Sequence, residues 1–156
     1  MFDAPVDAWY VWIGLGITSV VLFGLVLGLP TASPPEANAV ADVVDTVAAS
    51  AHTQTADRPL SVEEVKLGPD RVSLRGPGGT SHATFVYGPV TPVRDGTLLW
   101  EVVQGAAPEH VFDSPAAFRR AIRAARERVP AWRAADDRLV VRTVTWEGTD
   151  VTLVDA

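Results

Sequence analysis

The stretch RLVVRTVTWEGTDVTLVDA, residues 138–156, decides the fold predicted for this chain. It contains two runs rich in valine and threonine, residue types that favour β-strands. Between the runs stands Glu147-Gly148-Thr149, and a short glycine-containing break between two such runs is typical of a hairpin turn. The sequence therefore predicts an antiparallel hairpin here, around which the other elements of a domain can be arranged.

Further strands are predicted upstream of this hairpin. They are VKLGPDRVSLR (65–75, two strands around Gly68-Pro69-Asp70), SHATFVYG (81–88) and TLLWEVVQG (97–105). GPGGT at 76–80 and Asp95-Gly96 predict turns between them, because glycine next to proline or aspartate favours tight turns.

One helix is predicted among these strands, within DSPAAFRRAIRAARERVPAW at 113–132. Ser114 is placed as its N-cap, Pro115 at its first position and Pro130 at its end. Its apolar stripe is Phe118, Ile122, Ala125 and Val129. The sequence thus predicts a small α+β domain at 58–156, with an antiparallel sheet of about five to six strands packed with one helix.

The N-terminal segment, residues 1–30, has a different pattern. No residue from Trp9 to Leu29 is charged, and a helix of that length covers about 30 Å, the thickness of a bilayer core. Trp9, Tyr10 and Trp12 would lie at the headgroup boundary, and Pro30 would end the helix. We therefore expect a single transmembrane helix that places the protein in the cell membrane with the lipid bilayer as its first partner.

Two other interpretations of this segment are weaker. A secretory signal would need a basic start, yet no Lys or Arg precedes Arg58, and a buried core helix would exceed what a small core can surround. Gly24 and Gly28 form a G-x-x-x-G pair that could bring two such helices together. Because no basic residue flanks the run, the positive-inside rule leaves the orientation open.

Residues 31–57 are predicted to form a proline-rich break and a spacer helix at 34–51. Ser33 and Glu36 have capping-box spacing, and the face with Val40, Val44, Val47 and Ala51 is apolar. This helix is expected to pack on the domain or on a partner.

The overall charge excludes one broad function. The chain has 19 acidic and 13 basic residues, a net charge of −6, and every basic residue except Lys66 is arginine. General nucleic-acid binders are usually basic, so nucleic acid is not an expected partner. Such an acidic, lysine-poor composition instead indicates a halophilic source, since carboxylates keep a protein soluble at high salt. A mesophile with skewed codon usage is the alternative.

No catalytic, cofactor or metal site is predicted. Cysteine is absent, RGPGGTSH (75–82) lacks the lysine of a phosphate-binding loop, and His52, His82 and His110 are scattered. Asp136-Asp137 could bind a cation, but exposed acidic turn residues are far more usual. The chain is therefore expected not to be an enzyme.

The least ordinary feature is the density of arginine at 119–142, where eight arginines meet only three carboxylates. The candidate partner surface lies on the predicted helix and consists of Arg119, Arg120, Arg123 and Arg126. It would dock an acidic partner or anionic headgroups. The alternative is a solvated face whose arginines pair with carboxylates elsewhere in the chain.

MFDAPVDAWYVWIGLGITSVVLFGLVLGLPTASPP (1–35) together with SHATFVYGPVTPV (81–93) resembles an uncharacterised haloarchaeal family of small single-pass membrane proteins. The resemblance implies an association with type IV pili or related surface assemblies, with the domain outside the membrane. Two departures speak against a pilin that polymerises. No basic residue followed by a small one precedes the apolar run, and Pro30 breaks the helix that pilins continue into the head.

The sequence as a whole favours a membrane-anchored, non-enzymatic structural or interaction module, accessory to such an assembly. The alternative is a cytoplasm-facing, membrane-tethered scaffold or regulatory domain that docks an acidic partner through its arginine-rich helix.

Overall fold

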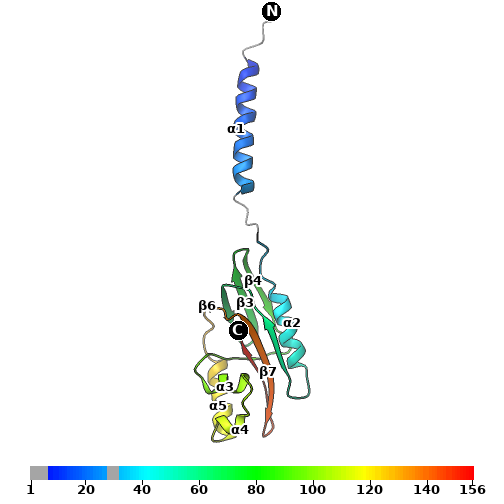
Figure 1. The fold of residues 1–156 in the computed structure, drawn as a ribbon, viewed down its shortest axis with the longest axis vertical. Coiled ribbons are helices and arrows are strands. Elements are labelled where there is room, and N and C mark those ends of the chain that lie inside the picture. The colour runs from blue at the N-terminus through cyan, green and yellow to red at the C-terminus, as the bar shows by residue number, and fades with distance from the viewer. Residues whose placement is uncertain (1–6, 28–31) are drawn as a thin grey trace, which may run out of the picture. The chain divides into compact units, whose positions relative to one another are not determined.

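A computed structural model describes residues 7–27 and 32–156 of the chain (Figure 1). These residues divide into two compact units, Met1–Ala32 and Ser33–Ala156. Each unit is treated by itself below.

The first unit contains helix α1, Asp7–Leu27. Over residues 7–27 and 32–156, no helix combines the length and the apolar character that crossing a membrane requires. This finding contradicts the transmembrane helix predicted at 9–29 and the single-pass membrane localisation that followed from it.

Only some of the residues expected to anchor this helix in a membrane have a described environment. Trp9 and Trp12 are exposed on α1. Gly28 and Pro30 lie outside the described residues, as do the side chain of Tyr10 and the surroundings of Gly24. The predicted pairing of helices through Gly24 and Gly28 therefore falls on residues that the structure does not describe.

The C-terminal hairpin forms the centre of the second unit, as the sequence predicts. Strands β7 (Arg138–Trp146) and β8 (Thr149–Asp155) pair antiparallel, with Trp146 opposite Thr149. The two turn residues, Glu147 and Gly148, have φ of 45° and 73°. Two successive positive φ values are typical of the tight turns that match the twist of a hairpin, which explains the glycine.

Two outer strands complete the first sheet, whose order is β1-β7-β8-β5. Strand β1 (Thr55–Pro59) pairs antiparallel with β7, and the short β5 (Thr91–Pro92) pairs parallel with β8. The parallel pair matters for the candidate site, because it brings a distant loop to the end of β8.

The second sheet has the order β4-β3-β2-β6. Its strands are β2 (Glu64–Leu67), β3 (Arg71–Gly76), β4 (Gly79–Thr84) and β6 (Arg133–Ala134). The predicted pair of strands at 65–75 and the turn at 76–80 are confirmed, with Gly79 at φ +119°, a conformation that favours glycine.

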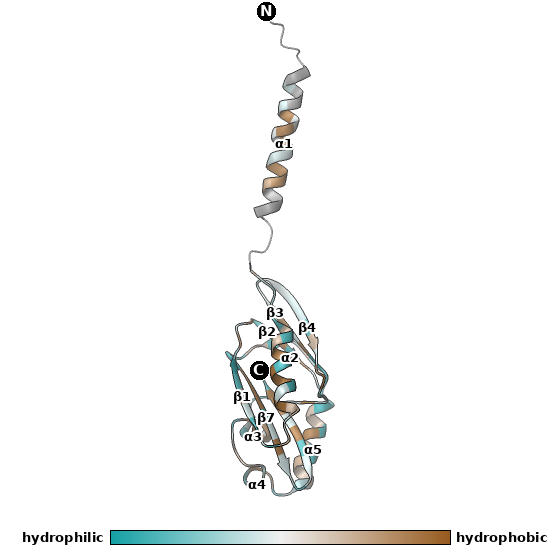
Figure 2. Cartoon of the chain, turned by 90° about the vertical axis from the view of Figure 1, so that its right-hand side faces the viewer, coloured by the Kyte–Doolittle hydropathy of each residue, from teal (hydrophilic) through white to brown (hydrophobic). Residues whose placement is uncertain are grey.

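Helix α2 (Ala37–Ala48) forms within the predicted spacer segment and belongs to the second unit (Figure 2). Val40, Val44 and Val47 are buried in a core shared with both sheets, whereas Ala51 is exposed beyond the helix end. The predicted capping box is wrong, since Glu36 is the N-cap and makes no side-chain capping bond.

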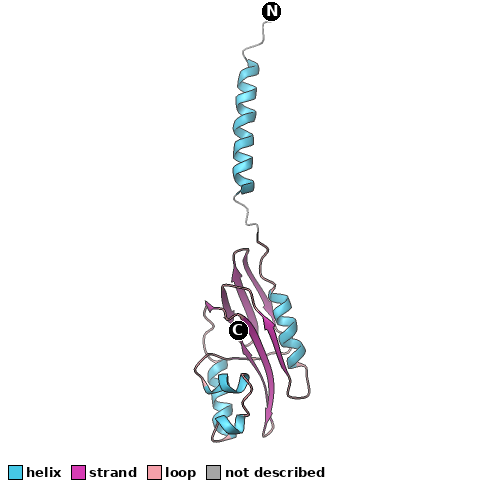
Figure 3. Cartoon of the chain, viewed as in Figure 1, coloured by secondary structure: helices cyan, strands magenta, loops and turns pink. Residues whose placement is uncertain are grey.

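Helices α3 (Leu98–Val103), α4 (Pro108–Val111) and α5 (Pro115–Arg126) gather around a second core (Figure 3). Segment 97–105, predicted as a strand, forms α3 because Leu99, Val102 and Val103 recur at helical spacing and are all buried. Ser114 caps α5 as predicted, its hydroxyl accepting a hydrogen bond from the Ala117 amide at 3.2 Å.

The apolar stripe predicted for α5 is wrong at its last residue. Because α5 ends at Arg126, Val129 lies beyond it and is 83% exposed. Phe118, Ile122 and Ala125 are buried as expected.

The hairpin connects the two cores because its side chains alternate between them. Val141 and Val154 belong to the core with α2, while Val140, Val144 and Leu153 belong to the core with α3 and α5. The described chain is therefore α+β with two four-stranded sheets and five helices. This corrects the prediction of a transmembrane helix, a spacer helix and one antiparallel sheet packed with one helix, and the β5–β8 pair is parallel.

Candidate functional site

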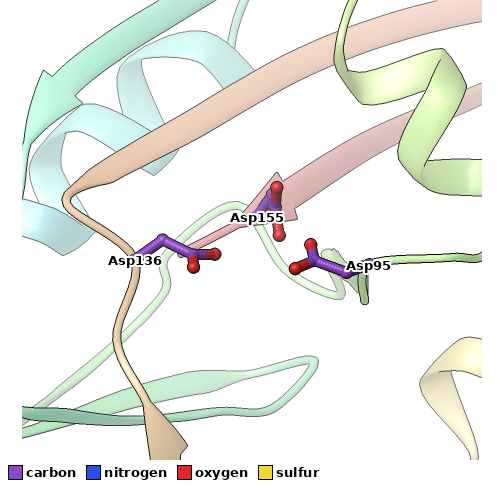
Figure 4. Close-up of side chains that lie close together, drawn as sticks. All are labelled: Asp95, Asp136 and Asp155. Carbon is purple, nitrogen blue, oxygen red and sulfur yellow. The ribbon is translucent and has the colours of Figure 1, made fainter.

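Three carboxylates from separate parts of the chain meet at one end of β8. Asp95 lies in the turn between β5 and α3, Asp136 lies in the link between β6 and β7, and Asp155 ends β8. One oxygen of each lies within 4.8 Å of the others (Figure 4). In the close-up, Asp95 and Asp136 approach Asp155 from opposite sides.

Strand register explains why these residues meet. Antiparallel pairing sets Asp155 opposite Val140, near the start of β7, so the link that carries Asp136 passes close by. On the other side of β8, parallel pairing sets Pro92 beside Val154, and the Val93 amide donates to the Val154 carbonyl at 2.8 Å. The turn with Asp95 follows directly, so the sheet itself assembles the cluster.

Asp155 is the buried member of the cluster, with 5% of its surface exposed. Its Oδ2 accepts a hydrogen bond from Gln104 Nε2 at 3.3 Å, while Oδ1 has no hydrogen-bond partner in the described part of the chain. Buried polar atoms are nearly always paired, so an orphaned carboxylate oxygen requires an explanation.

Burial raises the pKa of Asp155 above the ordinary aspartate value, and the negative charges of Asp95 and Asp136 raise it further. Arg133 and the hydrogen bond from Gln104 oppose this shift without cancelling it. The carboxylates therefore carry more negative charge than their surroundings neutralise.

The neighbouring cations are mostly directed elsewhere. Arg133 Nη1 reaches Asp136 Oδ2 at 4.0 Å, a long ion pair, while Arg138 contacts Asp57 at 3.0 Å and Gln104 Oε1 at 3.1 Å. An open cavity of about 380 Å³, lined by the three aspartates together with Trp100 and Asp137, gives the cluster access to solvent. Such a set of oxygens can hold a hard divalent cation.

The sequence identified only part of this cluster. The sequence favours an exposed acidic turn over a cation site at Asp136-Asp137, and the structure places Asp136 in the cluster but not Asp137. Asp95 and Asp155 were missed because their proximity depends on the parallel β5–β8 pair. No local sequence motif predicts that pairing.

The arginines of the predicted partner surface differ from one another. Arg119, Arg120 and Arg123 are exposed on α5, and none of them pairs with a carboxylate within 4.0 Å in the described residues. Arg126 is half-buried, and its Nε donates to Thr91 Oγ1 at 2.9 Å. Burial lowers the pKa of Arg126, and the charge of Asp70 partly offsets this effect.

Other arginines of the dense segment have structural contacts. Arg142 Nη1 donates to the Val102 carbonyl at 2.5 Å and to the Ala106 carbonyl at 3.1 Å, which joins β7 to α3 and the segment after it. Arg138 pairs with Asp57 across the β1–β7 edge. Pairing with the rest of the protein thus accounts for these arginines and not for the three on α5.

The three histidines, His52, His82 and His110, are exposed on separate segments.

The fold and these surfaces define a small α+β protein with an acidic cluster at the end of β8 and an arginine face on α5. The chain belongs to a family of unknown function, DUF7283, whose model matches residues 3–144. No curated protein matches the chain, and no solved structure matches it. The predicted haloarchaeal source and pilus-related role stay predictions.

Proposed function

We propose that the protein is a non-enzymatic interaction module that docks an acidic protein partner on the arginine face of α5, formed by Arg119, Arg120 and Arg123. The observation that carries this proposal is their exposure without a carboxylate partner in the described residues. In a chain with a net charge of −6, unpaired arginines concentrated on one helix favour an external anion.

The opposite side of α5 is firmly packed, which supports the proposal energetically. Phe118, Ile122 and Ala125 are buried, and the Phe118 ring lies 5.2 Å from Phe112 and 5.6 Å from Trp146. A helix held in this way presents its arginines from a fixed backbone, so docking orders the arginine side chains but not the helix that carries them. Arginine is also suited to carboxylates, because its planar fork can donate two parallel hydrogen bonds.

Binding of a fluorescent glutamate-rich peptide, followed by anisotropy, tests this function. We expect the unmodified protein to bind the peptide, with an affinity that falls as salt rises. The double variant Arg119→Ser/Arg123→Ser should bind at least about 10-fold more weakly, since it loses two charge-assisted contacts.

The matched control is Arg71→Ser/Arg94→Ser, which removes the same charge from two exposed arginines outside α5. It should keep most of the affinity. Equal losses in the two double variants would reduce the effect to net charge, and an absence of binding by the unmodified protein would contradict the proposed function.

A further inference from the structure

The spacing of the three aspartates fits a single calcium ion. Ca²⁺ binds oxygen at about 2.3–2.6 Å, so two ligands on opposite sides of the ion lie about 4.6–5.2 Å apart. One carboxylate oxygen each of Asp95, Asp136 and Asp155 lies within 4.8 Å of the other two, which is close enough for the three side chains to converge on one such ion. Mg²⁺ demands near-ideal octahedral geometry and usually binds through only one or two carboxylates, so three aspartates from separate segments suit Ca²⁺ better.

The orphaned oxygen of Asp155 is a second, independent observation. Acidic side chains often gather on protein surfaces without a ligand. Asp155 differs from these, because only 5% of its surface is exposed and its Oδ1 has no hydrogen-bond partner in the described residues. The close-up shows one oxygen of its carboxylate directed toward the space between Asp95 and Asp136 (Figure 4). A cation in that space would supply the missing partner and remove the cost of the unpaired atom.

No protein cation among the described residues fills this role. Arg133 reaches only Asp136, and only at 4.0 Å, while the contacts of Arg138 are with Asp57 and Gln104. The adjoining cavity leaves room for the waters that complete the six to eight oxygens Ca²⁺ prefers.

We propose that Asp95, Asp136 and Asp155 bind one Ca²⁺, which ties the β5–α3 turn and the β6–β7 link to the end of β8. The ion offsets two of the three negative charges that these segments bring together and therefore stabilises the folded chain. This inference is independent of the partner surface on α5, because it concerns different residues and a different ligand.

Calorimetric titration of the full chain with CaCl₂ and with MgCl₂, after removal of metal by EDTA and dialysis, tests the proposal. We expect one Ca²⁺ per chain and weaker binding of Mg²⁺. Asp95→Asn and Asp155→Asn should each weaken Ca²⁺ binding by at least about 10-fold, because each removes a charged ligand. Circular dichroism checks that both variants are folded.

Asp137→Asn is the matched control, since Asp137 lines the same cavity, adjoins Asp136 and is not part of the cluster. It should change the Ca²⁺ affinity by no more than about twofold, as expected for a screened surface charge. In thermal unfolding, Ca²⁺ should raise the midpoint of the unmodified protein and of this control, and should leave that of Asp95→Asn nearly unchanged.

Three results would overturn the proposal. One is the absence of both binding heat and a thermal shift at millimolar Ca²⁺. Another is an equal loss in Asp137→Asn and Asp95→Asn, which would indicate a diffuse acidic surface. The third is tighter binding of Mg²⁺ than of Ca²⁺. If Asp155→Asn does not fold, Asp95→Asn decides the outcome alone, because Asp95 is exposed and its substitution leaves the core intact.

Discussion

At the scale of single residues, Asp155 gives a pH dependence with a definite sign. Its pKa is raised in the folded state, so the folded chain holds this proton more tightly than the unfolded chain does. The stabilisation is present below the ordinary aspartate range and is lost as pH rises through the raised pKa. Above that pH, without calcium, the charged side chain weakens the fold.

We therefore expect Asp155→Asn to raise the free energy of unfolding at neutral pH in EDTA by about 1 kcal/mol, because the amide can donate to Asp95 and Asp136. Urea unfolding at several pH values measures this. The variant should also lose the decline in stability above the aspartate range. A variant less stable than the unmodified protein in EDTA would contradict the account.

Arginines on α5 should separate into two groups by their effect on stability. Arg126→Ser loses the hydrogen bond to Thr91 and part of a buried side chain, so we expect a cost of about 1 kcal/mol. Arg119→Ser changes an exposed side chain and should stay within about 0.5 kcal/mol of the unmodified protein. Chemical denaturation of both variants gives the comparison. Similar costs would mean that Arg119 has a structural role.

At the scale of elements, the N-cap of α5 should make a measurable contribution to the free energy of unfolding. Ser114→Ala removes the acceptor of the Ala117 amide, and we expect a loss of about 1 kcal/mol. Thermal or urea unfolding measures it, and Ser114→Asp, which can cap the helix in the same way, should restore most of the stability. Failure of that rescue would show that the hydroxyl acts by some other contact.

Helix α2 is part of the core, so substitution of its buried face should destabilise the domain. Val44 is fully buried, and Val44→Ala should cost about 2 kcal/mol in a single cooperative transition. Thr46→Ala, on the exposed side of the same helix, is the control and should change little. A small effect of Val44→Ala would mean that α2 does not contribute to the stability of the second unit.

Elements with strong local signals were the ones that the sequence predicted well. The β7–β8 hairpin has its turn glycine, and α5 has a cap, a proline and an apolar stripe. Helix α3 was predicted as a strand because half of LLWEVV is β-branched or aromatic. The helix is only six residues long, too short for its helical periodicity to be recognised in the sequence. Tertiary packing against β8 decides its conformation rather than local preference.

At the scale of the whole molecule, the missed features depend on contacts distant in sequence. The division into two sheets, the parallel β5–β8 pair and the meeting of Asp95 with Asp155 have no local signature. The transmembrane prediction was made from the run at 9–29, and the described helices do not bear it out. The exposure of Arg119, Arg120 and Arg123 was predictable from helical spacing alone, whereas the contact of Arg126 with Thr91 depends on the tertiary fold.

The proposed docking surface is the central claim, and its position can be mapped directly. Titration of ¹⁵N-labelled protein with the glutamate-rich peptide, followed by NMR, reports which amides respond to the ligand. We expect the largest shifts in α5, around Arg119, Arg120 and Arg123, and their loss in Arg119→Ser/Arg123→Ser. Shifts spread over the other arginines, or concentrated away from α5, would contradict the account.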